Sequence, residues 1–224
     1  MPNAADEFDK MAERGESLGA SSSYGDLGVM CGPYFAHGEY GVLFERKGFN
    51  QVVKIMNLDV IDDGEIDESN YNIMEFLNDW RHEGIRNLPK IYYWLRQEVY
   101  KETIHTVKYL CAANGQSALY EEVLNFEIGD EIFAYSMEVL DAFNWKHYDT
   151  INSARKAIAE AVIAIYEETG ELITDFKPSN VGLRGDTIVI FDFKLASPQQ
   201  EARFVFAEDK VSEILNDWYF FSNP

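Results

Sequence analysis

The first part of the chain alternates between short apolar stretches and glycine-containing turns. Residues 1–28 precede this pattern and are mostly polar and small, which is typical of a flexible arm with at most one helical turn. The stretches that follow are rich in β-branched and aromatic residues, so we expect three successive antiparallel strands. These strands are predicted at residues 29–35, 41–44 and 51–56.

The middle of the chain combines one helical pattern with further apolar stretches. Apolar residues recur at helical spacing after an acidic loop, which predicts a helix over residues 69–82. The stretches after Pro89 are rich in Ile, Val and Tyr and indicate more strands. These are predicted at residues 90–100, 103–112 and 132–140, and they should complete a mixed sheet.

The second half changes to a helical period. Apolar residues trace one face of a helix that should end near Gly170, because glycine commonly stands just past a helix end. Gly185 and Asp186 then separate two β-prone stretches, which predicts a tight hairpin. The predicted elements are a helix at 151–170, a hairpin at 181–191 and a final amphipathic segment at 207–218.

The chain is apolar enough to fold and also carries a strong negative charge. Apolar residues make up 46% of the 224 residues, which excludes a disordered chain. The net charge of −20 disfavours direct binding to nucleic acid, because phosphate contacts need clustered Lys and Arg. Partners should be basic or reached through a metal. The acidic surface either keeps the protein in solution or docks on surfaces that normally receive nucleic acid.

The cysteines and the N-terminus favour a cytoplasmic protein. Cys31 and Cys111 are far apart and lack the spacing of a disulfide framework or zinc site. Asp6, Glu7 and Asp9 stand where a signal peptide would be basic and then apolar. We therefore expect no signal peptide, and no apolar run approaches the length that spans a membrane.

The candidate chemistry lies in the second half. The segment from Asp175 to Asn180 reads Asp-x-Lys-x-x-Asn, with Lys177 in its middle. After the predicted hairpin, an apolar strand ends at Asp192, which is followed by Phe193. In this order, the pieces resemble the catalytic loop and the metal-binding Asp-Phe-Gly segment of protein kinases. The alternative is a turn-rich hairpin with Asp and Asn at ordinary turn positions.

The resemblance implies a role for each of these residues. Asp175 would accept or orient the proton of the substrate hydroxyl, and Lys177 would contact the transferred phosphate. Asn180 and Asp192 would hold Mg²⁺ that bridges the phosphates of ATP. Phosphoryl transfer needs such groups because charge must be offset at the phosphates.

The first half contains weaker matches to the same family. Gly38 and Gly41 resemble a glycine-rich nucleotide loop whose first glycine is replaced, and Lys54 resembles the strand lysine that pairs with the nucleotide phosphates. Glu75 is the candidate carboxylate that would hold this lysine, with Glu68 as the competitor. The alternatives are a snorkelling strand lysine and an exposed helix glutamate. The strand at 132–140 resembles the one that enters the adenine-binding hinge.

The chain departs from ordinary protein kinases in three ways. Ile173 and Thr174 stand in place of the usual His-Arg, so control by phosphorylation of an activation loop is not expected. Lys194 replaces the glycine after Asp192 and Phe193, which removes a permissive backbone position and adds a charge. Only residues 193–224 follow, so the large lobe is shortened. This plan resembles the early serine/threonine protein kinases of T7-like bacteriophages.

The resemblance implies an α+β fold with two lobes. An arm at residues 1–28 would precede a nucleotide-binding lobe with an antiparallel sheet at 29–140 and a shortened helical lobe at 141–224. The expected activity is ATP- and Mg²⁺-dependent phosphorylation of Ser or Thr on proteins, with the host transcription machinery among the candidate substrates. Three alternatives stay open: a pseudokinase that inhibits a host factor, a small-molecule phosphotransferase, and an acidic mimic of DNA.

Overall fold

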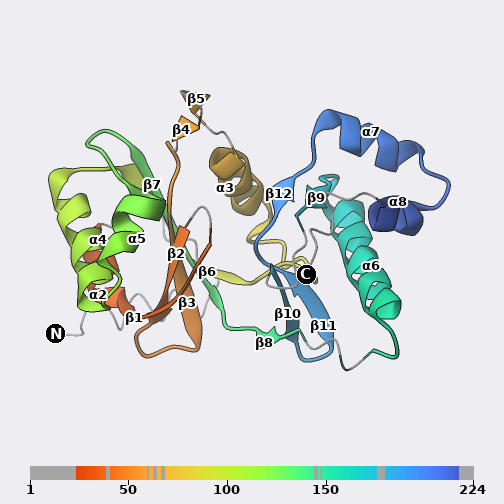
Figure 1. Cartoon of the computed structure of the whole chain (residues 1–224), viewed down its shortest axis with the longest axis horizontal. Coiled ribbons are helices and arrows are strands. Elements are labelled where there is room, and N and C mark those ends of the chain that lie inside the picture. The colour runs from red at the N-terminus through yellow and green to blue at the C-terminus, as the bar shows by residue number, and fades with distance from the viewer. Residues whose placement is uncertain are drawn as a thin grey trace. The chain divides into compact units, whose positions relative to one another are not determined.

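The computed structural model is a mixed α+β protein (Figure 1). It describes residues 24–38, 41–59, 61–62, 65–66, 69–143, 146, 148–175 and 180–216. The chain forms two compact units, which are described separately. The first consists of Met1–Met74 and Lys90–Val139, and the second of Glu75–Pro89 and Leu140–Pro224. Residues 75–89 thus belong to the second unit, although the sequence suggested a nucleotide-binding lobe that includes them.

The first unit contains a five-stranded antiparallel sheet in the order β1-β2-β3-β7-β6. Its strands are β1 (Cys31–Gly38), β2 (Gly41–Arg46), β3 (Gln51–Asn57), β6 (Ile91–Glu98) and β7 (Glu131–Glu138). The prediction of three successive antiparallel strands is confirmed, with β1 beginning two residues later than expected. The strands predicted at 90–100 and 132–140 are also confirmed, and β7 lies between β3 and β6. The prediction of a mixed sheet is wrong, because every pair of neighbouring strands is antiparallel.

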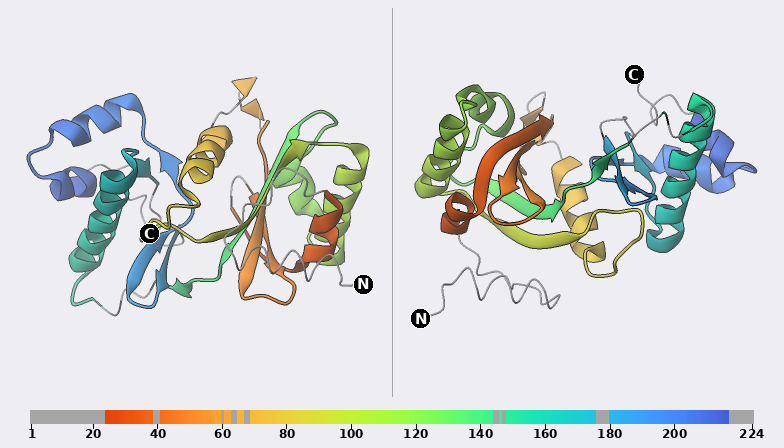
Figure 2. Two further views of the ribbon diagram at one scale, coloured as in Figure 1. Left: turned by 180° about the vertical axis from the view of Figure 1, so that it is seen from behind. Right: turned by 90° about the horizontal axis from the view of Figure 1, so that it is seen from below.

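Helices cover one face of this sheet, and two predictions fail there. The strand predicted at 103–112 is instead helix α4 (Lys101–Ala113), whose buried residues recur at helical spacing. The end of the predicted flexible arm is helix α2 (Tyr24–Met30), in which Leu27 is fully buried. A short helix α5 (Ser117–Leu119) and a π-helical turn η1 (Tyr120–Leu124) complete the layer. Figure 2 shows α2, α4 and α5 on the same side of the sheet.

The sheet and the helical layer of the first unit both contribute buried apolar side chains to one core. Val42, Phe44, Val53 and Ile55 of the sheet pack with residues of the helical layer, including Leu27. Successive strand residues point to opposite faces, so Leu43 and Lys54 lie on the other face of the sheet. That face is the one relevant to the candidate nucleotide site.

A helix connects the first unit to the second. After the short strands β4 (Ile61–Asp62) and β5 (Glu65–Ile66), helix α3 covers Ser69–Trp80, which confirms the helix predicted at 69–82. Asn70 at its start donates from Nδ2 to the carbonyl oxygen of Asn57 at 2.7 Å. This bond ties the first turn of α3 to the end of β3.

The second unit contains the long helix and the hairpin expected from the sequence. Helix α6 covers Ile151–Thr169, with a Thr150 and Ser153 capping box at its start and Gly170 in the left-handed conformation after its end. Strands β10 (Val181–Arg184) and β11 (Thr187–Ile190) form the hairpin, and β8 (Asp141–Ala142) pairs with β10. A Cβ on Gly182 would lie 2.6 Å from the Leu140 Cβ, so the close approach of β10 to this segment requires glycine.

Two further helices follow the candidate chemistry. Strands β9 (Ile173–Thr174) and β12 (Lys194–Leu195) form a two-stranded ribbon, and helices α7 (Pro198–Phe206) and α8 (Lys210–Asn216) follow. Helix α8 lies within the predicted segment at 207–218, of which 217–218 are outside the described residues. Helix α7 was not predicted, although its capping box and its proline at the first turn are helix-start signals. Within the described part of the chain, no helix is long and apolar enough to cross a membrane.

Candidate functional site

The candidate catalytic loop begins where α6 ends. Gly170 reverses the chain, β9 follows, and Asp175 comes directly after this strand. Asp175 has a φ of 65°, which is in the left-handed region that non-glycine residues seldom adopt. Among the described residues, Asn125 is the other non-glycine residue with a positive φ. Asp adopts this conformation more readily than most non-glycine residues do, and surrounding contacts help to hold it.

Asn180 provides one of these contacts. Its side chain is buried, and its Nδ2 donates to the carbonyl oxygen of Asp175 at 3.1 Å. Its own carbonyl oxygen accepts from the backbone N–H of Phe191 at 3.0 Å. Asn180 is therefore bonded both to Asp175 and to the residue that precedes Asp192.

The ribbon of β9 and β12 provides a second contact. Thr174, which precedes Asp175, is opposite Lys194, and Ile173 is opposite Leu195. The backbone N–H of Ala196 donates to the carbonyl oxygen of Leu172 at 2.8 Å and extends the ribbon by one bond. The chain on either side of the candidate site is thus held in register.

The Asp192 segment is anchored by the residue after it. Phe193 is buried and meets Phe76 of α3 edge to face, with ring centroids 5.4 Å apart. Asp192 and Lys194 on either side of Phe193 are only half-buried. The second unit therefore brings Asp175, Asn180 and the Asp192 segment together, whereas Lys177 lies outside the described residues.

Lys54 is the candidate nucleotide residue of the first unit. It lies in β3, opposite Leu43 of β2 and Tyr135 of β7. Cross-strand partners share a face, so Lys54 is on the face away from α2 and α4. Its side chain is only 5% exposed. Burial of an ammonium group is costly without oxygen partners, so this is not an ordinary surface lysine.

The two candidate glycines close the hairpin beside Lys54. Gly38 is paired with Gly41, and residues 39–40 at the tip lie outside the described part of the chain. A Cβ on Gly41 would lie 2.9 Å from the carbonyl oxygen of Ile55 and 3.1 Å from the Lys54 Cε. The close approach of β2 to β3 therefore requires glycine at position 41.

Glu75, the candidate partner of Lys54, has the surroundings of an ordinary helix residue. Glu75 lies on the exposed side of α3, whose apolar residues Ile73, Met74, Phe76 and Leu77 are buried. An exposed glutamate is also what an ordinary amphipathic helix would present. The competitor Glu68 lies outside the described residues.

A polar cluster that the sequence did not indicate holds the start of α3. The Tyr71 hydroxyl is 2.8 Å from Asp59 Oδ1 and 3.0 Å from Glu131 Oε2. Arg96 donates to both carboxylate oxygens of Glu131, at 3.1 and 2.7 Å. Burial raises the pKa of Tyr71, and its hydrogen bonds to Asp59 and Glu131 raise it further. No local pattern could have indicated this cluster, because it joins four separate segments.

The candidate metal ligands Asn180 and Asp192 are a carboxamide and a carboxylate. Carboxylate and carboxamide oxygens are the ligands that Mg²⁺ prefers, and nucleotide-bound Mg²⁺ usually takes only one or two from the protein. The bond from Asn180 Nδ2 to Asp175 turns the carboxamide oxygen away from that carbonyl. Among the residues that the structure describes, no group of three or more His, Cys, Asp or Glu side chains could hold a metal ion.

The chain matches no protein-family model and no curated protein sequence.

Proposed function

We propose that this protein is an ATP- and Mg²⁺-dependent serine/threonine protein kinase. Asp175 would take the catalytic position, with Asn180 and Asp192 as metal ligands. Lys54 and the hairpin of Gly38 and Gly41 would contact the nucleotide, and Glu75 is the candidate partner of Lys54. Lys177 would contact the transferred phosphate.

The proposed reaction moves the γ-phosphoryl group of ATP to a protein hydroxyl. The bond between the γ-phosphorus and the β,γ-bridging oxygen breaks, and a bond from the Ser or Thr oxygen to that phosphorus forms. The products are ADP and a phosphoester. Asp175 orients the hydroxyl and accepts its proton, which then passes to solvent. When bound, Mg²⁺ supplies positive charge that offsets the charge of the phosphates.

The observation that best supports this proposal is the bonding around Asp175. An aspartate with a φ of 65° is held by Asn180 on one side and by the β9 and β12 ribbon on the other. Unfavourable backbone conformations that are held in this way occur frequently at functional sites. The buried Asn180 side chain bonds to Asp175, while its backbone bond to Phe191 extends the β10–β11 hairpin by one pair.

The test is transfer of label from [γ-³²P]ATP with Mg²⁺ to the protein itself and to a bacterial lysate. Asp175→Asn and Asp192→Asn should each lower the rate at least about 10²-fold, because each removes a charge needed in the transition state. Asp186→Asn is the matched control, since Asp186 lies in the β10–β11 turn away from the ribbon. Equal labelling by all four proteins would contradict the proposal.

A pseudokinase is the second candidate, and Lys194 is the observation that favours it. The lysine brings a positive charge into the segment that contains the candidate metal ligand Asp192. A pseudokinase would bind nucleotide but label no protein, and its acidic surface would bind a basic host protein. Binding of ATP without transfer by the wild-type protein would favour this alternative over the kinase.

A further inference from the structure

The backbone at position 194 does not require the glycine that the kinase resemblance would place there. Lys194 belongs to β12 and is paired with Thr174 of β9. It has no positive φ; among the described non-glycine residues, that conformation occurs at Asn125 and Asp175. A side chain at position 194 therefore causes no backbone strain. What distinguishes Lys194 from glycine is its stem and its charge.

Lys194 is close in the fold to the segments that carry both candidate carboxylates. Cross-strand partners have Cβ atoms about 4.5–5.5 Å apart, so the Lys194 Cβ is next to Thr174, which precedes Asp175. Asp192 is two residues before Lys194 in the chain. The ribbon fixes this arrangement, because the Thr174 hydroxyl donates to the Lys194 carbonyl oxygen at 3.3 Å.

The partial burial of Lys194 is compatible with a role in binding a ligand. Lys194 is half-buried, while the neighbouring Phe193 is buried against Phe76. A half-buried lysine keeps its stem against protein and its ammonium group near solvent. The ammonium group is a compact point charge that binds phosphate well.

We propose that Lys194 is a phosphate-binding residue that supplies part of the positive charge otherwise supplied by a divalent cation. This inference rests on the proposed function, because it assigns Lys194 to the nucleotide of the same site. In this role, the positive charge that Lys194 adds next to the candidate metal ligand Asp192 assists nucleotide binding. The lysine would attract the nucleotide phosphates even before Mg²⁺ binds.

The experiment measures binding of a fluorescent non-hydrolysable ATP analogue by anisotropy, first in EDTA and then with increasing Mg²⁺. Lys194→Gln should weaken metal-free binding about tenfold, because it removes one cation next to the phosphates. Lys194→Arg should stay within about threefold of the wild type, since it keeps the charge. Addition of Mg²⁺ should narrow the difference between Lys194→Gln and the wild type.

Lys156→Gln is the matched control, because it changes the net charge equally at an exposed position on α6. It should bind the analogue as the wild type does. Equal metal-free binding by Lys194→Gln and the wild type would overturn the inference, and so would tighter Mg²⁺-dependent binding by Lys194→Gln. If the wild type binds no analogue with or without Mg²⁺, the proposed function itself fails and this role fails with it. Binding without label transfer would contradict only the kinase activity.

Discussion

The carboxylate of Glu131 is ionised more readily in the folded protein than in the unfolded chain. The hydrogen bonds from Arg96 lower its pKa most, and burial opposes them with the next largest effect. The hydrogen bond from the Tyr71 hydroxyl and the charge of Arg96 lower the pKa further. The pair is partly exposed, so its contribution to stability is modest. It nevertheless joins β6, β7 and the start of α3 through three side chains.

The sign of the pH effect follows from this lowered pKa. A carboxylate with a lowered pKa stabilises the fold above its unfolded pKa, and the contribution is lost as the pH falls through the folded pKa. Glu131→Gln should therefore lower the free energy of unfolding by about 0.5–1 kcal/mol at pH 7. The difference from the wild type should disappear at acidic pH, below the lowered pKa of Glu131.

Urea unfolding of both proteins across the pH range measures this difference. Glu121→Gln is a suitable control, because its ion pair with Lys108 is more exposed and links different elements. A Glu131→Gln difference that stayed constant down to strongly acidic pH would show that the lost contact is not the ionised pair.

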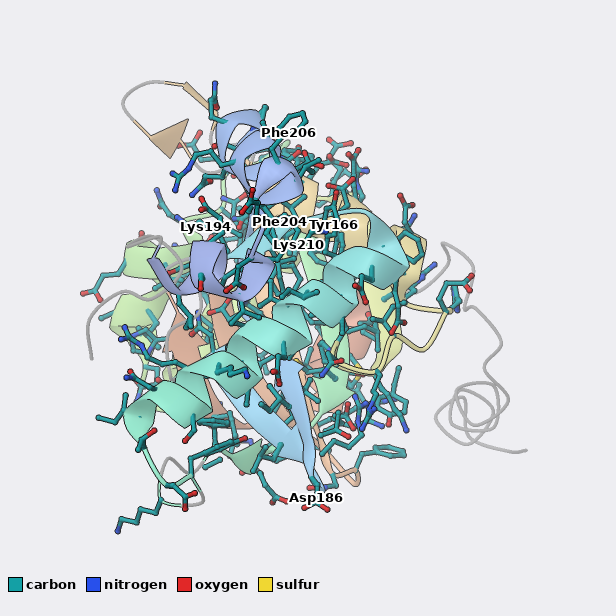
Figure 3. The ribbon with its side chains drawn as sticks, turned by 90° about the vertical axis from the view of Figure 1, so that its right-hand side faces the viewer. Tyr166, Asp186, Lys194, Phe204, Phe206 and Lys210 are labelled. Carbon is teal, nitrogen blue, oxygen red and sulfur yellow. The ribbon has the colours of Figure 1, made fainter. Side chains whose placement is uncertain are left out.

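At the scale of elements, helices α7 and α8 pack against the helix that leads into the candidate catalytic loop. Phe204 and Ile214 are fully buried, and Phe204 meets Tyr166 of α6 edge to face at 4.9 Å. Lys210 of α8 lies 4.9 Å from the Phe204 ring centroid and 5.4 Å from that of Tyr166. Figure 3 shows the side chains of Tyr166, Phe204 and Lys210 close together, with Phe206 away from them on α7. The residues after Asp192 therefore support the loop, although they are few.

Two phenylalanines of α7 provide a matched pair of variants. Phe204→Ala should lower the free energy of unfolding of the second unit by about 3–4 kcal/mol, because it leaves a cavity in a packed core. Phe206→Ala, two residues later, should change it by less than about 0.5 kcal/mol, because its side chain is 86% exposed. Chemical denaturation followed by near-UV circular dichroism compares the two. Similar losses would mean that Phe206 is covered in solution.

At the scale of the whole molecule, the charge of −20 opposes the compact state. Like charges are closer together in the folded protein than in the unfolded chain, and salt screens their repulsion. Raising NaCl from 20 to 300 mM should therefore increase stability by about 1 kcal/mol, or the melting temperature by about 2–4 °C. Differential scanning calorimetry at the two salt concentrations measures this shift.

A variant with three fewer negative charges is the control for the salt effect. Glu167, Glu168 and Glu171 are exposed near the end of α6, and replacing all three with Gln changes the formal net charge from −20 to −17. This variant should gain less from salt than the wild type does. A melting temperature that fell with salt would indicate that attractive ion pairs outweigh the repulsion.

The local pattern of the sequence determined most of the elements. Alternating and β-branched stretches predicted five strands of the large sheet, and helical spacing with a final glycine predicted α3 and α6. These features are decided within about 20 residues, so they can be recognised from the chain alone. The β-branched and aromatic residues of α4 favour a strand locally, although its buried residues recur at helical spacing, at Thr103, Val107, Leu110 and Cys111.

The tertiary structure alone decided how distant residues meet. The sequence indicated Asp175, Asn180 and Asp192 as candidates, but not the positive φ of Asp175 or its bond to Asn180. The pairing of Thr174 with Lys194 joins residues 20 positions apart, and the cluster around Tyr71 joins four segments. Such contacts depend on how packed elements approach one another, and no local period records that. The sequence therefore determined which elements form and which residues are candidates, whereas packing decided the conformation and neighbours of each.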